Sequence, residues 1–177
     1  NEKQIAIDGK KLCGTAPKEK GPKGDYLLNA YVAENSLFIG QEKLCDKENE
    51  IPAIPRLLDK LEITDAIISI DAMGTQVDIA KKIVAKKGHY FLAVKENQGA
   101  LLAEIKDVIK YNKPFSCHSE TEKEHARVET RTASVFRAQL MEDKEVLGRW
   151  KNLKTIVKVE THTVHVSDNG KETTQTR

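Results

Sequence analysis

The chain has 177 residues, 39% of them hydrophobic, and this length allows a sizeable buried core. Its 29 Lys and Arg residues against 27 Asp and Glu leave a formal net charge of +2, so a nucleic-acid-binding surface must come from local clustering of basic residues. Three cysteines without a CxxC pair, and no apolar run near the roughly 20 residues of a membrane span, predict a reduced, cytoplasmic protein with no membrane partner.

The first 44 residues predict three strands. Gln4–Ile7 is a short β-favouring run that ends on Asp8. A stretch rich in Lys, Gly and Pro, residues 15–25, then predicts an exposed loop. Tyr26–Val32 and Ser36–Leu44 are apolar and β-favouring, and the polar residues between them predict a hairpin. We therefore expect three antiparallel strands, the first of which carries Asp8.

The next segment changes to helical spacing and then returns to a strand. Residues 50–61 place apolar side chains on one helical face, with Asn49 as N-cap. Glu50 then falls in the first turn of this helix, where a negative charge is favourable. We prefer this explanation of Glu50 to the alternative that it supports a ligand of a metal site. The isoleucine-rich run Ala66–Ile70 predicts a buried strand that ends at Asp71.

Two more helices and one more strand complete this alternation. Thr75 is predicted to cap a helix that runs through Lys87 and stops at Gly88. Residues 89–94 predict another short buried strand. Asn97 is predicted to open a helix that ends near Tyr111. Three antiparallel strands followed by alternating helices and parallel strands match the ribonuclease-H-like arrangement, an α/β fold with a mixed sheet.

Beyond Pro114 the pattern is mainly β. Residues 116–124 are polar and charged, whereas residues 125–140 and 154–166 alternate as strands do. The dipeptide Asn169-Gly170 after Asp168 predicts a hairpin turn. We therefore divide the chain into a core over residues 1–114 and a mainly β insertion over residues 115–177.

Asp8 and Asp71 are the candidate metal ligands. Each stands where a predicted strand ends, and the carboxyl ends of strands are where ligands gather in open α/β sheets. Two carboxylates from neighbouring strands could share Mg²⁺ or Mn²⁺, which prefer oxygen ligands. The alternative is that each aspartate only caps the turn or helix that follows it.

Basic and amide side chains follow the same strand ends or lie on one strand of the insertion, and they are candidate DNA contacts. They are Lys10, Lys11, Lys95, Asn97, Gln98, His125 and Arg127. The alternatives are a solvated loop, a helix cap at Asn97, and an ordinary exposed charged strand that also carries Glu129 and Arg131.

Four short blocks together resemble bacterial insertion-sequence transposases of the DDE type, in the branch of the H-repeat-associated proteins. These blocks are Ile5-Ala6-Ile7-Asp8-Gly9-Lys10, Asn49-Glu50-Ile51-Pro52, Ile70-Asp71-Ala72-Met73 with Gln76, and Lys95-Glu96-Asn97-Gln98. The segment His125–Arg131 resembles a further block of that branch, which usually has glycine where Ala126 stands. The resemblance covers essentially the whole chain.

The resemblance implies a ribonuclease-H-like core that cuts and joins DNA with two Mg²⁺ ions, acting on transposon ends and target DNA as a homodimer in the full-length protein. Asp8 and Asp71 match the first two acids of the catalytic triad. The third is a glutamate in a Trp-x-Ile-Glu-Asn-like block, and here Trp150 is followed by Lys151-Asn152-Leu153 instead. Glu129 lies in the insertion and is not a substitute. We therefore expect a catalytic-core fragment that is inactive alone.

Two alternatives stay open at this point. The chain could be a non-catalytic nucleic-acid-binding remnant of the same fold, or an unrelated Mg²⁺-dependent phosphohydrolase that uses Asp8 and Asp71. No P-loop or GxGxxG sequence is present to support a nucleotide enzyme.

Overall fold

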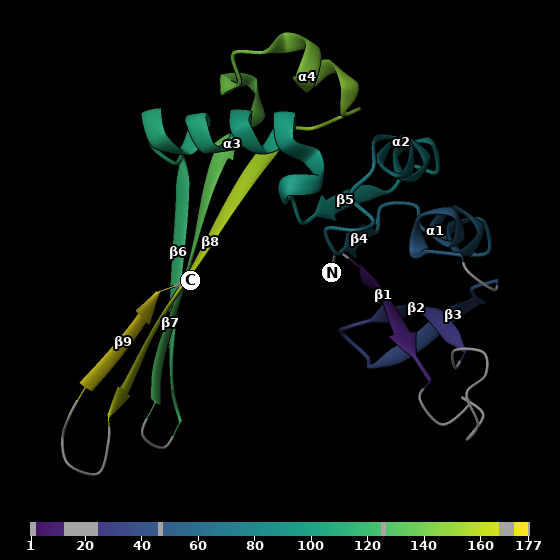
Figure 1. Ribbon diagram of the computed structural model, residues 1–177, viewed down its shortest axis with the longest axis horizontal. Coiled ribbons are helices and arrows are strands. Elements are labelled where there is room, and N and C mark those ends of the chain that lie inside the picture. The colour runs from purple at the N-terminus through teal and green to yellow at the C-terminus, as the bar shows by residue number, and fades with distance from the viewer. Residues whose placement is uncertain (1–2, 13–24, 46–47, 125–126, 167–171, 177) are drawn as a thin grey trace. The chain divides into compact units, whose positions relative to one another are not determined.

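The structure is a computed structural model that describes residues 3–12, 25–45, 48–124, 127–166 and 172–176. The chain divides into two compact units, and each contains its own β-sheet (Figure 1). The first unit is Asn1–Gly99 with Gly148–Asn152, and the second is Ala100–Leu147 with Leu153–Arg177. The protein is therefore a mixed α/β chain with two sheets, as expected.

The sheet of the first unit is mixed, with the strand order β3-β2-β1-β4-β5. Its strands are β1 (Gln4–Lys11), β2 (Tyr26–Val32), β3 (Leu37–Lys43), β4 (Ile67–Ile70) and β5 (His89–Leu92). Strands β1, β2 and β3 pair antiparallel, whereas β4 runs parallel to both β1 and β5. The three predicted antiparallel strands and the parallel strands that follow them are thus confirmed, but β5 was predicted to be buried and its residues are instead exposed or half-buried.

Helices α1 (Glu50–Asp59) and α2 (Val77–Ala85) lie next to each other and supply one side of the core of this unit (Figure 1). Alternate residues of the central strands, Ile5 and Ile7 on β1 and Ile68 and Ile70 on β4, are buried in the same apolar cluster as the helices. Burying such a side chain stabilises the fold by about 1.5–3 kcal/mol. Because strand side chains alternate between faces, the residues between these isoleucines point to the other face of the sheet.

The ends of α2 differ from the prediction. The N-cap is Gln76, and Thr75 is fully buried with its hydroxyl directed at two backbone carbonyls, so its predicted capping role was wrong. At the other end Lys87 adopts the left-handed conformation (φ 60°) that we expected of a glycine. Gly88 instead serves packing, since a Cβ there would lie 3.1 Å from the carbonyl oxygen of Ile63.

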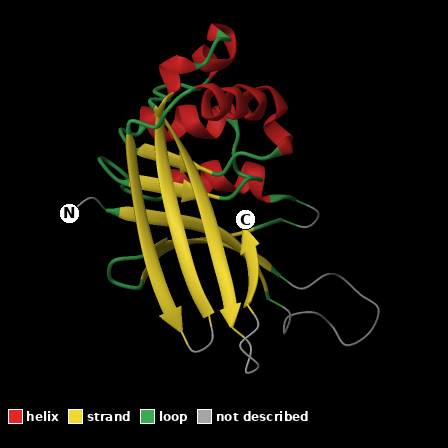
Figure 2. Ribbon diagram, turned by 90° about the vertical axis from the view of Figure 1, so that its left-hand side faces the viewer, coloured by secondary structure: helices red, strands yellow, loops and turns green. Residues whose placement is uncertain are grey.

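The second unit is built on an antiparallel sheet in the order β6-β7-β8-β9, whose long strands Figure 2 shows side by side. Its strands are β6 (Ser116–Glu124), β7 (Arg127–Arg137), β8 (Thr155–Val166) and β9 (Glu172–Thr176). Helix α3 (Gly99–Tyr111) follows a 3-10 turn (Glu96–Gln98), and a further 3-10 turn (Ala138–Leu140) and α4 (Lys144–Arg149) lie between β7 and β8. Strand β6 was not predicted, because all nine of its residues are exposed and no apolar alternation marks it.

Some sequence predictions fall outside the described residues, namely most of the loop over residues 15–25, the turn around Asn169-Gly170, and His125. The division of the chain after Pro114 stays a prediction; in the structure most of α3 belongs to the second unit. Cys45 and Cys117 are free thiols. No helix within the described ranges combines the length and apolar character needed to cross a membrane.

Candidate active site

Asp8 and Asp71 occupy corresponding positions along two neighbouring strands. Asp71 directly follows β4, as predicted, whereas β1 continues to Lys11, so the prediction that this strand ends at Asp8 was wrong. In the parallel pairing of β1 with β4, Ile7 lies opposite Ile70, and each aspartate follows directly in the chain. Both aspartates are exposed, whereas both isoleucines are buried. Because side chains alternate along a strand, the two carboxylates extend from the face of the sheet opposite the isoleucine core. Neighbouring strands lie about 4.8 Å apart, so this register favours one shared site.

The turn after β4 orients Asp71. Its Oδ1 accepts hydrogen bonds from the backbone N–H groups of Met73, at 3.1 Å, and Gly74, at 3.3 Å. Asp71 therefore does cap a turn, as the alternative interpretation had it. These two bonds fix the direction of the carboxylate, and such fixing is also what a metal ligand requires.

Thr75 and Gln98 join this turn to the segment after β5. The hydroxyl of Thr75 donates to the carbonyl oxygen of Ala93 at 2.6 Å and lies 3.2 Å from that of Asp71. The side-chain amide of Gln98 donates to the carbonyl oxygen of Thr75 at 2.8 Å. In addition, Asn97 donates to the carbonyl oxygen of Ala72 at 2.6 Å.

Asn97 and Gln98 were predicted to contact DNA, and Asn97 alternatively to cap a helix. Their amide nitrogens instead hold the loop that carries Asp71, and the predicted cap at Asn97 was wrong because Asn97 lies within the 3-10 turn. A DNA contact through either residue stays a prediction. Lys10, Lys11 and Lys95 are exposed, as a contact with phosphates requires, and their role also stays a prediction.

Glu50 is buried, although it lies in the first turn of α1 as expected. Only 8% of its surface is exposed, and its Oε1 accepts a hydrogen bond of 2.6 Å from the phenol of Tyr26 on β2. This hydrogen bond, burial, and the charges of Glu50, Asp8 and Asp71 raise the pKa of Tyr26 to about 12. Sequence reasoning missed Tyr26, since nothing local links it to a helix 24 residues away.

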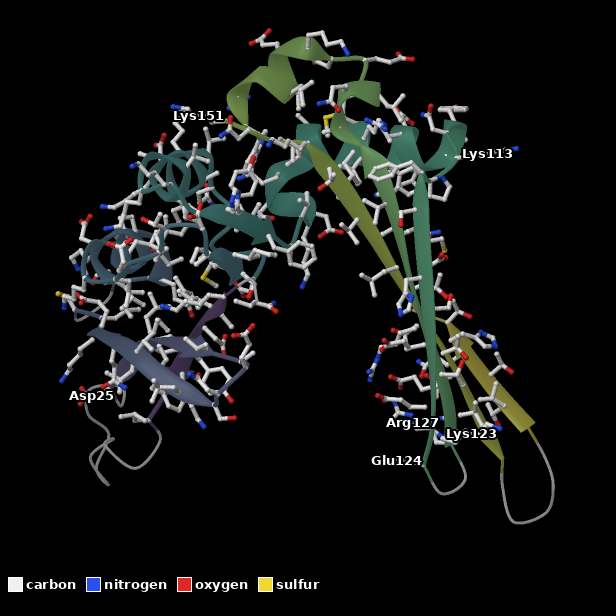
Figure 3. All side chains as sticks on the ribbon, turned by 180° about the vertical axis from the view of Figure 1, so that it is seen from behind. Asp25, Lys113, Lys123, Glu124, Arg127 and Lys151 are labelled. Atoms are coloured by element: carbon white, nitrogen blue, oxygen red, sulfur yellow. The ribbon has the colours of Figure 1, made fainter. Side chains whose placement is uncertain are left out.

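In the second unit, Glu129 on β7 lies between two arginines of the same strand. Its carboxylate forms ion pairs with Arg127 and Arg131, and the hydroxyl of Thr163 lies 3.5 Å from its Oε2. Only 6% of Glu129 is exposed. Arg127 is the first residue of β7 and lies beside Lys123 and Glu124, the last residues of β6 (Figure 3). Arg127 is exposed, and its predicted contact with DNA stays a prediction.

The donor atoms of Asp8 and Asp71 suit a hard cation such as Mg²⁺, which prefers carboxylate oxygens and keeps several waters. Within the described part of the chain, no group of three or more His, Cys, Asp or Glu side chains is arranged to hold a metal ion. Two aspartates alone leave most of the coordination shell to water, substrate or other protein groups. The residues present therefore fit part of a magnesium site.

Comparison with known proteins identifies the family. A family model described as a transposase DDE domain matches residues 2–167. The chain belongs to the DDE transposase family. This family match confirms the resemblance found in the sequence blocks, and it excludes the alternative of an unrelated phosphohydrolase.

Similar proteins include several from Escherichia coli K12. YncI, named as a candidate transposase, is 44% identical over 132 residues, which make up 72% of this chain and 53% of YncI. YbfD, named as an H repeat-associated candidate transposase, is 42% identical over 131 residues, or 72% of this chain and 52% of YbfD. An uncharacterised protein of Xanthobacter autotrophicus is 34% identical over 163 residues, or 89% of this chain and 53% of that protein. The transposase domain thus spans about half the length of these relatives.

Among solved structures, the transposase domain is similar to a chain of the piggyBac transposase synaptic complex with hairpin DNA. The TM-score is 0.42 at 12% sequence identity, over 88% of this chain and 32% of that one.

Proposed function

We propose that the chain is part of the catalytic core of a DNA transposase, with Asp8 and Asp71 as two of its metal ligands. The observation that carries this proposal is the parallel pairing of β1 with β4, in which both aspartates follow paired isoleucines. The strand order β3-β2-β1-β4-β5, with three antiparallel strands before the parallel ones, supports a ribonuclease-H-like core. Membership of the DDE family supports the chemistry.

The proposed reaction is cleavage of phosphodiester bonds and strand transfer, both displacements at phosphorus. Two bound Mg²⁺ or Mn²⁺ ions would activate the attacking oxygen and stabilise the charge on the leaving oxygen. Asp8 and Asp71 contribute carboxylate oxygens, and the turn at Met73 and Gly74 holds Asp71 in one orientation. Lys10, Lys11 and Lys95 bind phosphates of the DNA near the same strand ends. Arg127, which belongs to the second unit, also binds DNA phosphates.

The complete protein has a wider role in this proposal. It acts on transposon ends and target DNA as a homodimer in the bacterial cytoplasm. A third carboxylate completes the catalytic triad in this proposal, and neither Glu50, which is hydrogen-bonded to Tyr26, nor Glu129, which is paired with two arginines, supplies it.

Mn²⁺ binding tests the proposed site directly, because Mn²⁺ replaces Mg²⁺ in such sites and its free form is measured by electron paramagnetic resonance. We expect Asp8→Asn and Asp71→Asn each to weaken Mn²⁺ binding by at least about tenfold, since even the loss of a residue that supports a ligand costs about 10–100-fold. Asp78→Asn is the matched control; this aspartate lies in the first turn of α2 with its side chain 94% exposed. Binding that survives both site substitutions would exclude Asp8 and Asp71 as ligands.

DNA binding is expected to be weak, because the net charge is only +2. It should also be independent of sequence and strongly dependent on salt, because contacts with phosphates dominate such binding. Replacing Lys10, Lys11 and Lys95 together with alanine should weaken binding to all sequences and lower the salt slope by about 1 for each lysine that contacts a phosphate. Fluorescence anisotropy over a series of salt concentrations measures both quantities.

The control for this experiment is a second triple variant that removes the same total charge. Lys81, Lys106 and Lys113 are all exposed; Lys81 lies on α2, Lys106 on α3, and Lys113 follows α3. An equal loss of affinity in both triple variants would show that only net charge matters. Tight, salt-insensitive binding to one sequence would contradict the assignment of a catalytic core.

A further inference from the structure

The carboxylate of Glu50 in the first unit belongs to a buried residue, of which only 8% is exposed. Burying a carboxylate is costly unless it is hydrogen-bonded, and the phenol of Tyr26 provides such a bond at 2.6 Å. The helix begins at Glu50, with Asn49 as N-cap accepting from the backbone N–H of Ile51 at 3.1 Å. The helix N-terminus also favours a negative charge there. Glu50 is thus held in place from two sides.

Gly9 allows Glu50 to approach β1 closely. A Cβ atom on Gly9 would lie 2.1 Å from Oε1 of Glu50 and 2.6 Å from Cε1 of Tyr26, so no residue with a side chain fits without a shift of both. Gly9 directly follows Asp8 in β1. The Glu50 carboxylate therefore lies against the backbone immediately next to the first proposed metal ligand.

The geometry also indicates that Glu50 is not a metal ligand itself. Successive residues of a strand face opposite sides, so the Cβ direction of Gly9, where Glu50 lies, is opposite to that of Asp8. Leu28, which pairs with Gly9, is fully buried on the same side as Glu50. Glu50 therefore stands behind β1, whereas the Asp8 carboxylate extends from the front.

We propose that Glu50, held by Tyr26, is a positioning residue for Asp8: it fixes β1 at Gly9 and places a negative charge behind the two aspartates that strengthens cation binding. This inference rests on the proposed function, because it concerns the same metal site. Gly9, against which Glu50 lies, directly follows Asp8 in β1, and β1 pairs with β4, which leads into Asp71, so the three carboxylates come from one small region of the first unit. A fixed charge in a partly buried position acts across several ångströms with little screening.

The test is Mn²⁺ titration of the whole chain at pH 7.5, with thermal unfolding measured on the same samples. Glu50→Gln keeps the shape of the side chain and an oxygen that accepts from Tyr26, but it removes the charge. We expect its Mn²⁺ affinity to fall by roughly tenfold, with no loss of melting temperature. Glu62→Gln is the control, since it removes one charge from an exposed position after α1. Its Mn²⁺ affinity should equal that of the parent.

Tyr26→Phe provides a second variant that stays informative if Glu50→Gln does not fold. It keeps the ring against Gly9 and the charge of Glu50 but removes the hydrogen bond, and we expect a smaller loss of about threefold in Mn²⁺ affinity. Parent-like Mn²⁺ affinity in a folded Glu50→Gln variant, or in Tyr26→Phe, would overturn the inference. In both of those outcomes Asp71→Asn would still weaken binding, so the proposed function would stand. If Asp71→Asn changes nothing, the proposed function fails and this inference fails with it.

Discussion

We expect supercoiled plasmid DNA to stay uncut when it is incubated with residues 1–177 and Mg²⁺ or Mn²⁺. Asp8 and Asp71 hold part of a metal shell, but in the described residues no third acidic, histidine or cysteine side chain completes a metal-binding group with them. Misplacing a catalytic group by about 1 Å costs roughly a hundredfold in rate. The absence of a metal ligand should cost more than that, which takes cleavage below detection.

Glu129 is the carboxylate that most needs to be excluded as the third acid. Its oxygens are already engaged by Arg127 and Arg131, and its side chain is almost fully buried. To bind a metal it would have to break both ion pairs, which leaves two arginines next to the cation. Because the Glu129 carboxylate is itself buried, breaking both ion pairs would leave a buried charge without its partners, which is costly. Glu129 is therefore a structural residue of the β7 strand.

A nicking assay with three proteins measures this prediction. The parent chain, Asp71→Asn and Glu129→Gln are incubated with supercoiled plasmid, and the open circular form is quantified. Robust cleavage by the parent that both substitutions abolish would make Glu129 the third acid and reverse our conclusion. Cleavage that neither substitution affects would indicate a contaminating nuclease, and the preparation would have to be repurified.

The elements around Asp8 and Asp71 could be predicted because their patterns are local. The run Ala66–Ile70 is apolar, β-branched and short, and these properties alone favour a buried strand. Asn49 and the apolar spacing after it fix the start of α1 in the same way, and the structure confirms the N-cap. That β1 and β4 are neighbours was predicted from their matching strand-then-aspartate contexts and from the family resemblance, and the two strands do pair.

The contacts that hold the candidate site could not be predicted, because they join residues distant in sequence. Tyr26 and Glu50 are 24 residues apart, and Gln98 and Thr75 are 23 apart. Thr75 looked like a helix cap because threonine often is one, but tertiary contacts use its hydroxyl elsewhere. Strand β6 pairs with β7 and all nine of its residues are exposed, so its sequence carries no hydrophobic pattern.

The largest expected loss of stability comes from Ile68→Ala. Ile68 is fully buried in the core cluster of the first unit, and it is paired with Ile5 on β1 and Tyr90 on β5. Truncating a buried isoleucine to alanine typically lowers the free energy of unfolding by about 2–5 kcal/mol, because apolar burial is lost and a cavity remains. The transition midpoint in urea should fall by about 1–2 M.

Trp150 reports this unfolding, since it is the one tryptophan of the sequence, is 5% exposed and belongs to the first unit. Ile67→Ala is the matched control on the same strand; Ile67 is only half-buried and faces the other side of the sheet, so its loss should be on the order of 1 kcal/mol. Equal losses from the two variants would mean that the helix-covered face is not the core of this unit. The side on which Asp8 and Asp71 extend would then be wrong as well, because that assignment follows from the same alternation along β1 and β4.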